Sequence, residues 1–228
     1  MATVGSVNVG RPRPNPYKQT RSTGIVKEPQ PGAVEVRAPG TKSSGLGSGL
    51  VGDHIGDRRH HGGNDQAVYA FAREDLDRWQ QRLARPLANG SFGENLTTLD
   101  IDLRSSRLGE RWRIGSHLEL QVTCPRLPCS TFRGWMQERG WLKTFTADAR
   151  PGAYLRVVSP GSVQEGDSIE VAHRPGHAVT VAVAFRALTL EPSLLPGLVA
   201  AGDDLCDDLR RSVRQAAPDA VRRSERPS

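Results

Sequence analysis

The sequence predicts a mainly β protein with some α content: a twisted β-barrel with a few helices and a small C-terminal helical tail. Three observations predict this fold class. Short segments of alternating apolar and polar residues recur through residues 1–175, and turns rich in Gly and Pro separate them. One convincing helix, residues 73–83, interrupts this pattern. After Pro175 the apolar residues change to helical spacing.

The predicted strands follow from the alternation, because successive side chains of a strand point to opposite faces. The clearest is residues 117–123, which alternate over their full length and predict a half-buried strand. This strand runs directly into residues 125–129, so we expect that run to be held at a strand end. The predicted strands are residues 4–9, 33–37, 117–123, 154–158 and 168–171.

The predicted helices follow from apolar stripes. In residues 73–83, Leu76, Trp79 and Leu83 fall on one face, and acidic residues lie near the start, where the helix dipole favours them. Three further helices are expected in the tail, in residues 179–189, 192–201 and 203–215.

The chain is long enough for one main domain with a small appendage. We expect an N-terminal strand and a Pro-rich basic segment packed on the barrel, then the barrel core, the helical appendage and a disordered end. The corresponding ranges are residues 1–32, 33–175, 176–217 and 218–228.

Composition argues against several classes of protein. No apolar run approaches the roughly 18 residues that cross a bilayer, and the first residues lack the features of a secretory signal. We therefore expect a cytoplasmic protein without membrane contact. The net charge is +6, but basic and acidic residues are interleaved, so nucleic-acid binding ranks last among the functions considered. An odd count of three cysteines argues against a disulfide framework.

Cys129 is the first candidate functional residue. It lies just past a predicted strand, in the run Pro-Arg-Leu-Pro-Cys at residues 125–129. A thiol fixed beside the guanidinium of Arg126 is a candidate ligand or nucleophile, although buried cysteines more often serve as packing residues. For Arg126 the structural alternative is a salt bridge at a strand end. Cys124 is expected to pack, with a second ligand or a disulfide to Cys129 as alternatives.

Three segments together resemble the MOSC family, named for the C-terminal domain of molybdenum cofactor sulfurase. They are residues 57–69, which contain His-His-Gly-Gly, residues 90–96, which contain Gly-Ser-Phe-Gly-Glu-Asn, and residues 125–129. The chain looks most like the stand-alone bacterial YiiM-like members, which carry a helical tail. The resemblance implies a β-barrel fold and a bound molybdenum cofactor, molybdenum held by molybdopterin.

The resemblance also implies roles for individual residues. Cys129 corresponds to the proposed molybdenum ligand, and a soft thiolate suits that metal. Asp57, His60 and His61 are the expected catalytic residues, with one of the two histidines as proton donor. The expected cofactor-binding residues are Gly62, Gly63, Asn95, Arg126 and Lys143. For residues 90–95, a simple turn capped by Glu94 and Asn95 is the structural alternative. An iron site built from Asp57 and both histidines is disfavoured, because the side chains of adjacent residues on an extended segment point to opposite sides and rarely share a metal.

By the same resemblance, the expected activity is reduction of N-hydroxylated compounds such as hydroxylaminopurine-type bases. No flavin or iron–sulfur motif is visible, and neither these cofactors, haem nor pyridoxal phosphate is expected. Electrons must then come from a separate reductase, and a homodimer is possible. The alternative is a non-catalytic module that carries or binds molybdenum cofactor or sulfur.

Overall fold

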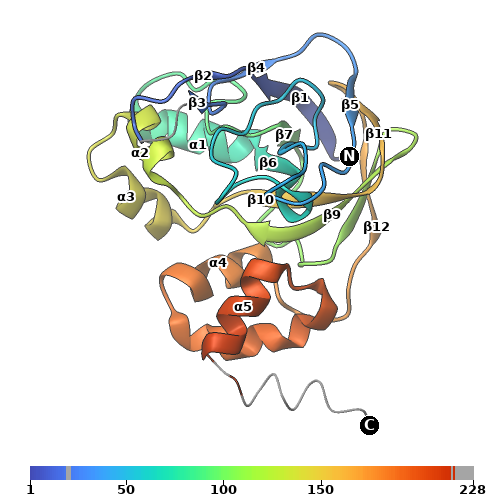
Figure 1. Ribbon diagram of the computed structural model, residues 1–228, viewed down its shortest axis with the longest axis vertical. Coiled ribbons are helices and arrows are strands. Elements are labelled where there is room, and N and C mark those ends of the chain that lie inside the picture. Colours follow the sequence, from blue (N-terminus) through green and yellow to red (C-terminus); the bar gives the residue numbers. More distant parts are fainter. Residues whose placement is uncertain (19–21, 217, 219–228) are drawn as a thin grey trace.

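The computed structural model describes residues 1–18, 22–216 and 218. The strands are β1 (Thr3–Gly10), β2 (Arg13–Pro14), β3 (Ser22–Thr23), β4 (Lys27–Pro29), β5 (Val34–Val36), β6 (Val68–Ala72), β7 (Leu96–Leu99), β8 (Arg111–Ile114), β9 (Leu118–Pro125), β10 (Ala153–Ser159), β11 (Gly161–Val163) and β12 (Ile169–His173). The α-helices are α1 (Arg73–Leu83), α2 (Ser130–Met136), α3 (Trp141–Asp148), α4 (Val181–Thr189) and α5 (Asp207–Ala216), and η1 (Asn64–Gln66) and η2 (Pro192–Asp204) are 3-10 helices (Figure 1).

Eight strands form one curved sheet in the order β12-β8-β9-β10-β6-β7-β1-β4, and only the β6–β7 pair is parallel. The predicted fold class, mainly β with some α, is confirmed. In the part of the chain that the structure describes, the sheet is not a closed barrel, because β12 and β4 do not pair. Instead, an isolated bridge joins Thr3 to Ser168, and the amide of Val4 donates to the carbonyl of Asp167 at 2.8 Å. These contacts bring β1 close to the start of β12.

A cluster of aromatic side chains packs between the sheet and helices α1, α2 and α3. Its centre is Trp141, whose ring lies 4.8 Å from Trp79 and 5.3 Å from Phe132. Helices α2 and α3 were not predicted. Each is only 7 or 8 residues long, and helices that short are stable only when packing against the rest of the protein supports them.

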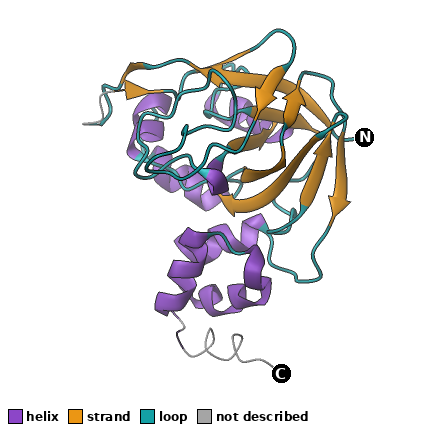
Figure 2. Cartoon of the chain, turned by 45° about the vertical axis from the view of Figure 1, so that its right-hand side comes forward, coloured by secondary structure: helices purple, strands orange, loops and turns teal. Residues whose placement is uncertain are grey.

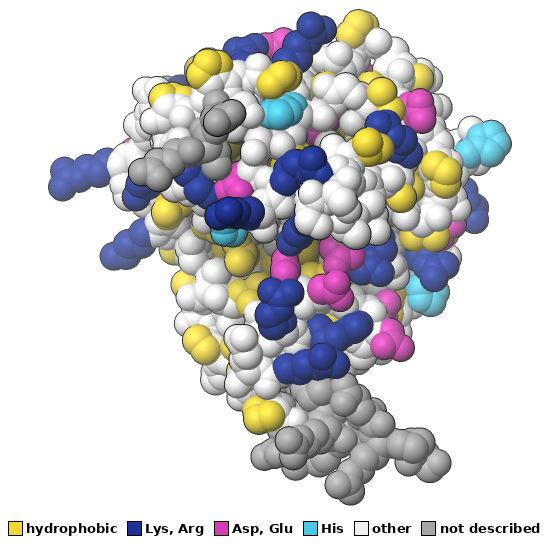
Figure 3. Space-filling view, in the orientation of Figure 1, with side chains coloured by type: hydrophobic (Ala, Val, Ile, Leu, Met, Phe, Trp, Pro, Cys, Tyr) yellow, Lys and Arg dark blue, Asp and Glu magenta, His cyan; other side chains and the backbone are white. Residues whose placement is uncertain are grey.

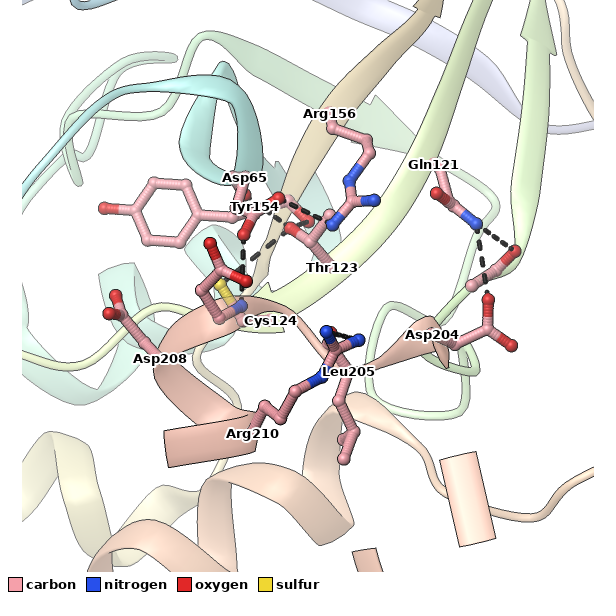
Figure 4. Close-up of polar contacts among 12 residues, drawn as sticks. Asp65, Gln121, Thr123, Cys124, Tyr154, Arg156, Asp204, Leu205, Asp208 and Arg210 are labelled. Atoms are coloured by element: carbon pink, nitrogen blue, oxygen red, sulfur yellow. Dashed lines mark hydrogen bonds and ion pairs between the residues drawn. The ribbon is translucent and has the colours of Figure 1, made fainter. Parts of the chain in front are cut away.

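The helical tail packs below β9 and β10 (Figures 1 and 2). Leu209 and Val213 of α5 are buried and belong to the same hydrophobic core as the sheet. A polar contact adds to this docking, because the Asp207 amide of the tail donates to the Asp65 carboxylate at 3.3 Å. Arg156 of β10 donates to the same carboxylate at 2.6 Å (Figure 4). The helical tail is therefore docked against the sheet by apolar and polar contacts.

The predicted boundaries can be compared with these elements. The expected N-terminal strand is β1, which lies inside the sheet between β7 and β4 rather than on top of it. The second tail helix is a 3-10 helix that contains Pro196 and a non-helical Gly202. Most of the predicted disordered end, residues 219–228, lies outside the described residues. Among the residues that are described, no helix is both long and apolar enough to span a membrane.

Candidate functional site

The three segments singled out in the sequence meet at one cavity, which we call the central cavity. Its empty space is about 690 Å³, part of it open solvent. Six of the predicted site residues line it: Asp57, His61, Gly62, Asn95, Arg126 and Cys129. Other lining residues include Thr23, Lys27, His54, Gln66, Tyr69 and Tyr154.

Cys129 lies between the end of β9 and the start of α2, where it is the N-terminal cap residue. Burial raises the pKa of its thiol, but a hydrogen bond with His61 and the positive charge of Arg126 outweigh burial and lower the pKa to about 6. The backbone amide of Phe132 also donates to the sulfur. At neutral pH Cys129 is therefore mainly a thiolate, the form that binds soft metals.

Arg126 is a buried cation beside this thiolate. Its side chain is stacked on Phe132, with the guanidinium carbon 3.7 Å from the ring centre, and the residue is only 5% exposed. Among the described residues, its Nη1 has no hydrogen-bond partner and no carboxylate forms an ion pair with it. The salt bridge considered for Arg126 is therefore absent from the described part of the chain. A buried cation with an unused donor suits an anionic ligand, and with a soft thiolate next to it the donor set fits a molybdenum cofactor.

His60 and His61 have different environments, although they are neighbours in the sequence. The amides of both histidines donate to the carbonyl of Asp57, which forms a tight turn. His61 lines the central cavity and reaches Cys129, whereas the His60 side chain is 65% exposed and contacts the Asp57 carboxylate at 3.1 Å. His61 is thus the histidine that the fold brings to the thiolate.

Asp57 lines the central cavity, but its carboxylate accepts hydrogen bonds from other side chains. Burial alone raises the pKa of its carboxyl, yet hydrogen bonds from Lys18 and His60 more than offset burial, so the pKa is lowered. The carboxylate therefore stays ionised at neutral pH and acts as an acceptor rather than as a proton donor.

Gly62 and Gly63 let two loops approach closely. Both have φ near +80°, and a Cβ on Gly62 would lie 2.6 Å from the carbonyl oxygen of Gly47. The amide of Gly63 donates to that same oxygen at 2.9 Å. The Gly63 amide, which was expected to approach an anion, is therefore used to hold the loop that carries His61.

The segment 90–95 builds the turn beside the cavity. Glu94 is fully buried and accepts hydrogen bonds from the amides of Gly90 and Phe92 and from the Thr97 hydroxyl. The amide of Asn95 donates to Asp53 at 2.9 Å and accepts from the amide of Tyr69 at 3.1 Å. Asn95 therefore lines the cavity, but these two contacts occupy its side chain within the protein.

Lys143 lies elsewhere. It is exposed on α3 and is absent from the lining of the central cavity.

Several lining residues had not been singled out from the sequence. Lys27 forms a buried ion pair with Asp53, which is not itself a lining residue and which also accepts from the Gly10 amide at 2.7 Å. Gln66 has a buried Oε1 atom without a partner among the described residues. Burial raises the pKa of the Tyr154 hydroxyl, although the nearby guanidinium of Arg126 opposes this effect. Asp53 and Gln66 do lie in or next to the motif segments, which was the one available signal.

The Cys124 thiol forms a hydrogen bond with a residue of the helical tail and no disulfide with Cys129. All three cysteines are free thiols, so the disulfide considered between Cys124 and Cys129 is not formed. A hydrogen bond with the Cys206 thiol, together with burial, raises the pKa of Cys124. No group of three or more His, Cys, Asp or Glu side chains within the described residues is arranged to hold a metal ion, as an iron site would require.

Comparison with known proteins identifies the class. The MOSC domain model matches residues 57–170, half of the chain, and the chain therefore belongs to the MOSC domain family. The Bacillus subtilis protein YflK is 30% identical over 185 residues, which cover 81% of this chain and 79% of YflK. A protein of Gibberella moniliformis named "Reductase" is 28% identical over 133 residues, covering 56% of this chain and 23% of that protein.

The fold resembles the crystal structure of YiiM from Geobacillus stearothermophilus, with a TM-score of 0.75 and 24% identity, covering 95% of this chain and 99% of YiiM. The chain is thus a YiiM-like MOSC protein. This membership supports a function related to the molybdenum cofactor.

Proposed function

We propose that this protein binds molybdenum cofactor in the central cavity and reduces N-hydroxylated compounds. The observation that carries the proposal is the Cys129 thiolate beside the buried guanidinium of Arg126, whose Nη1 has no hydrogen-bond partner among the described residues. A thiolate and a buried cation with a free donor atom in one cavity are the groups needed to hold a soft metal and the anionic part of its carrier. The "Reductase" name of one relative supports the class of reaction.

Each residue has a defined role in this proposal. Cys129 holds the metal, and Arg126 neutralises negative charge and keeps the sulfur ionised. His61 orients the thiolate and supplies a proton. When bound, the cofactor supplies the electron transfer to the N–O bond. The balance is two electrons and two protons for each N–O bond broken: the nitrogen is reduced to an amine and the oxygen leaves as water. A separate reductase delivers the two electrons.

The test is metal analysis of the wild type and Cys129→Ser, both purified from a host that makes molybdenum cofactor. We expect near-stoichiometric molybdenum in the wild type and its loss in Cys129→Ser. Cys206→Ala is the matched control, because it removes a buried thiol of the tail and leaves the central cavity intact. It should keep the metal.

Turnover of hydroxylamine with a chemical reductant separates the proposed enzyme from a carrier. Molybdenum with reduction of hydroxylamine supports the enzyme. Molybdenum without turnover supports the cofactor or sulfur carrier instead. Molybdenum retained by Cys129→Ser, or absent from a folded wild type, would overturn the assignment of the site.

A further inference from the structure

A second cavity lies between the sheet and the helical tail, next to Cys129. We call it the tail cavity, and its empty space is about 1030 Å³, part of it open solvent. All three cysteines of the chain line it: Cys124 at the end of β9, Cys129 just past that strand, and Cys206 just before α5. Figure 3 shows the face of the molecule hollowed above the tail, with hydrophobic side chains visible in the hollow and charged ones around it. A small molecule that enters the tail cavity therefore meets these thiols.

The thiols of Cys124 and Cys206 are in contact. Both residues are buried in the same hydrophobic core, and their side chains are hydrogen-bonded to each other. Asp65 joins the two segments that carry them, because its carbonyl accepts from the Thr123 hydroxyl at 2.5 Å and its carboxylate accepts from the Asp207 amide at 3.3 Å (Figure 4). Two cysteines form a disulfide only where the backbone already holds their side chains close together. The end of β9 and the start of α5 meet this condition.

The two thiols differ in acidity. The hydrogen bond with Cys124 lowers the pKa of Cys206, and although burial opposes this effect, the amide of Leu209 in the first turn of α5 adds to it. The same hydrogen bond, together with burial, raises the pKa of Cys124 well above its ordinary value. Because the thiolate is the nucleophile, Cys206 is the thiol that attacks first, and Cys124 is the neighbour that completes the bond.

Cys129 is engaged elsewhere. Its thiolate is held by hydrogen bonds with His61 and with the Phe132 amide. It also lines the central cavity, whereas Cys124 and Cys206 line only the tail cavity. The buried pair is therefore distinct from the thiol that we propose as the metal ligand.

We propose that Cys124 and Cys206 are an oxidation site that reacts with hydroperoxides and forms a disulfide between the sheet and the helical tail. With hydrogen peroxide, the Cys206 thiolate attacks one oxygen, so an S–O bond forms, the O–O bond breaks, and the released hydroxide takes up a proton to give water. The Cys124 sulfur then attacks the Cys206 sulfur, so the S–S bond forms, the S–O bond breaks, and the second oxygen leaves as water. The peroxide takes up the two electrons and the two thiol protons.

The disulfide ties α5 to β9. It closes the loop from residue 124 to residue 206, so α5 stays attached to the end of the strand even when the other contacts of the tail break. Leu209 and Ser212 of α5 line the tail cavity beside Cys129. Oxidation of the pair therefore fixes one wall of the space next to Cys129.

The experiment treats the full chain with hydrogen peroxide, blocks the remaining thiols with iodoacetamide, and maps tryptic peptides from the monomer band of a non-reducing gel. Trypsin cleaves after Arg and Lys, so the three cysteines fall on different peptides, residues 114–126, 127–133 and 187–210. We expect peptides 114–126 and 187–210 to be recovered joined, and dithiothreitol to separate them. A link from peptide 127–133 in place of this one, or no link in the folded protein, would overturn the proposal.

Two variants assign the link to the pair. Cys206→Ala should abolish it. Cys129→Ser is the matched control, because it removes the third thiol of the same cavity and leaves the pair intact. It should form the link to the same extent as the wild type, with or without molybdenum, so the result does not depend on the proposed function. Loss of the link in Cys129→Ser would contradict the assignment of Cys206 as the attacking thiol. The wild-type peptide map tests the proposal even if a variant fails to fold.

The melting temperature tests whether the link forms in the docked arrangement of the tail. Relative to Cys206→Ala treated in the same way, the oxidised wild type should gain about 5 °C or more in Tm, because a disulfide that closes a long loop restricts the unfolded chain. Dithiothreitol should remove this gain. A link that leaves Tm unchanged or lowers it would mean that the disulfide forms in a distorted chain, and the proposed oxidation site would be wrong.

Discussion

The low pKa of Cys129 depends on His61, and replacing this histidine tests the geometry of the site. His61→Leu removes the hydrogen bond to the thiolate. A hydrogen bond to a charged group contributes about 1.5–3 kcal/mol, and one pKa unit corresponds to about 1.36 kcal/mol. The pKa of Cys129 should therefore rise by about one to two units, from about 6 to about 7–8. At pH 7 the thiolate fraction should fall from about 90% to between about 10% and 50%.

The assay is the rate of alkylation by iodoacetamide as a function of pH, followed for the Cys129 peptide by mass spectrometry. Only the thiolate reacts, so the midpoint of the rate profile reports the pKa. His60→Leu is the matched control, because His60 is the neighbouring histidine and its recorded contact is with Asp57. Its midpoint should stay near pH 6. An unchanged midpoint in His61→Leu, or an equal shift in both variants, would refute this explanation of the low pKa.

The same pKa links the thiol to folding. Because the pKa of Cys129 is lower in the folded protein than its ordinary value of 9, ionisation stabilises the folded state. This contribution is complete above about pH 9, decreases as the pH falls, and is lost near pH 6. The free energy of unfolding, measured with urea, should therefore change more between these two pH values in the wild type than in Cys129→Ser.

Three further substitutions test other parts of the site. Arg126→Met should abolish molybdenum binding and raise the pKa of Cys129. Its Tm should change little, because the loss of a cation–π contact of about 1–2 kcal/mol is offset by no longer burying a charge. Arg133→Met, at an exposed residue of α2, is the control and should change neither molybdenum binding nor the pKa of Cys129. Glu94→Ala leaves three buried donors without their acceptor and should lower the free energy of unfolding by about 3 kcal/mol or more in urea. Gly62→Ala should lower Tm more than Gly32→Ala does, because both glycines have φ of +81° but only at Gly62 would a Cβ meet the backbone; equal effects would contradict the predicted clash.

Local patterns in the sequence were enough to place several elements. Helix α1 occupies residues 73–83 as predicted, and β9 runs from Leu118 to Pro125, directly into the run that carries Cys129. Alternation and helical spacing depend on residues a few positions apart, which is why they can be read from the sequence. Helices α2 and α3 could not be read in this way, because a distant aromatic cluster stabilises them.

The sequence by itself therefore determined the fold class, the resemblance of three motif segments to the MOSC family, and the position of the Cys129 thiol past a strand end. Only the tertiary structure decided which predicted residues lie together. It brought His61 rather than His60 to Cys129 and joined the Asn95 amide to Asp53. It also left the Nη1 atom of Arg126 without a hydrogen-bond partner among the described residues. It also brought the tail to the other side of Cys129. Each of these facts depends on burial and on partners far away in the chain, which no local pattern records.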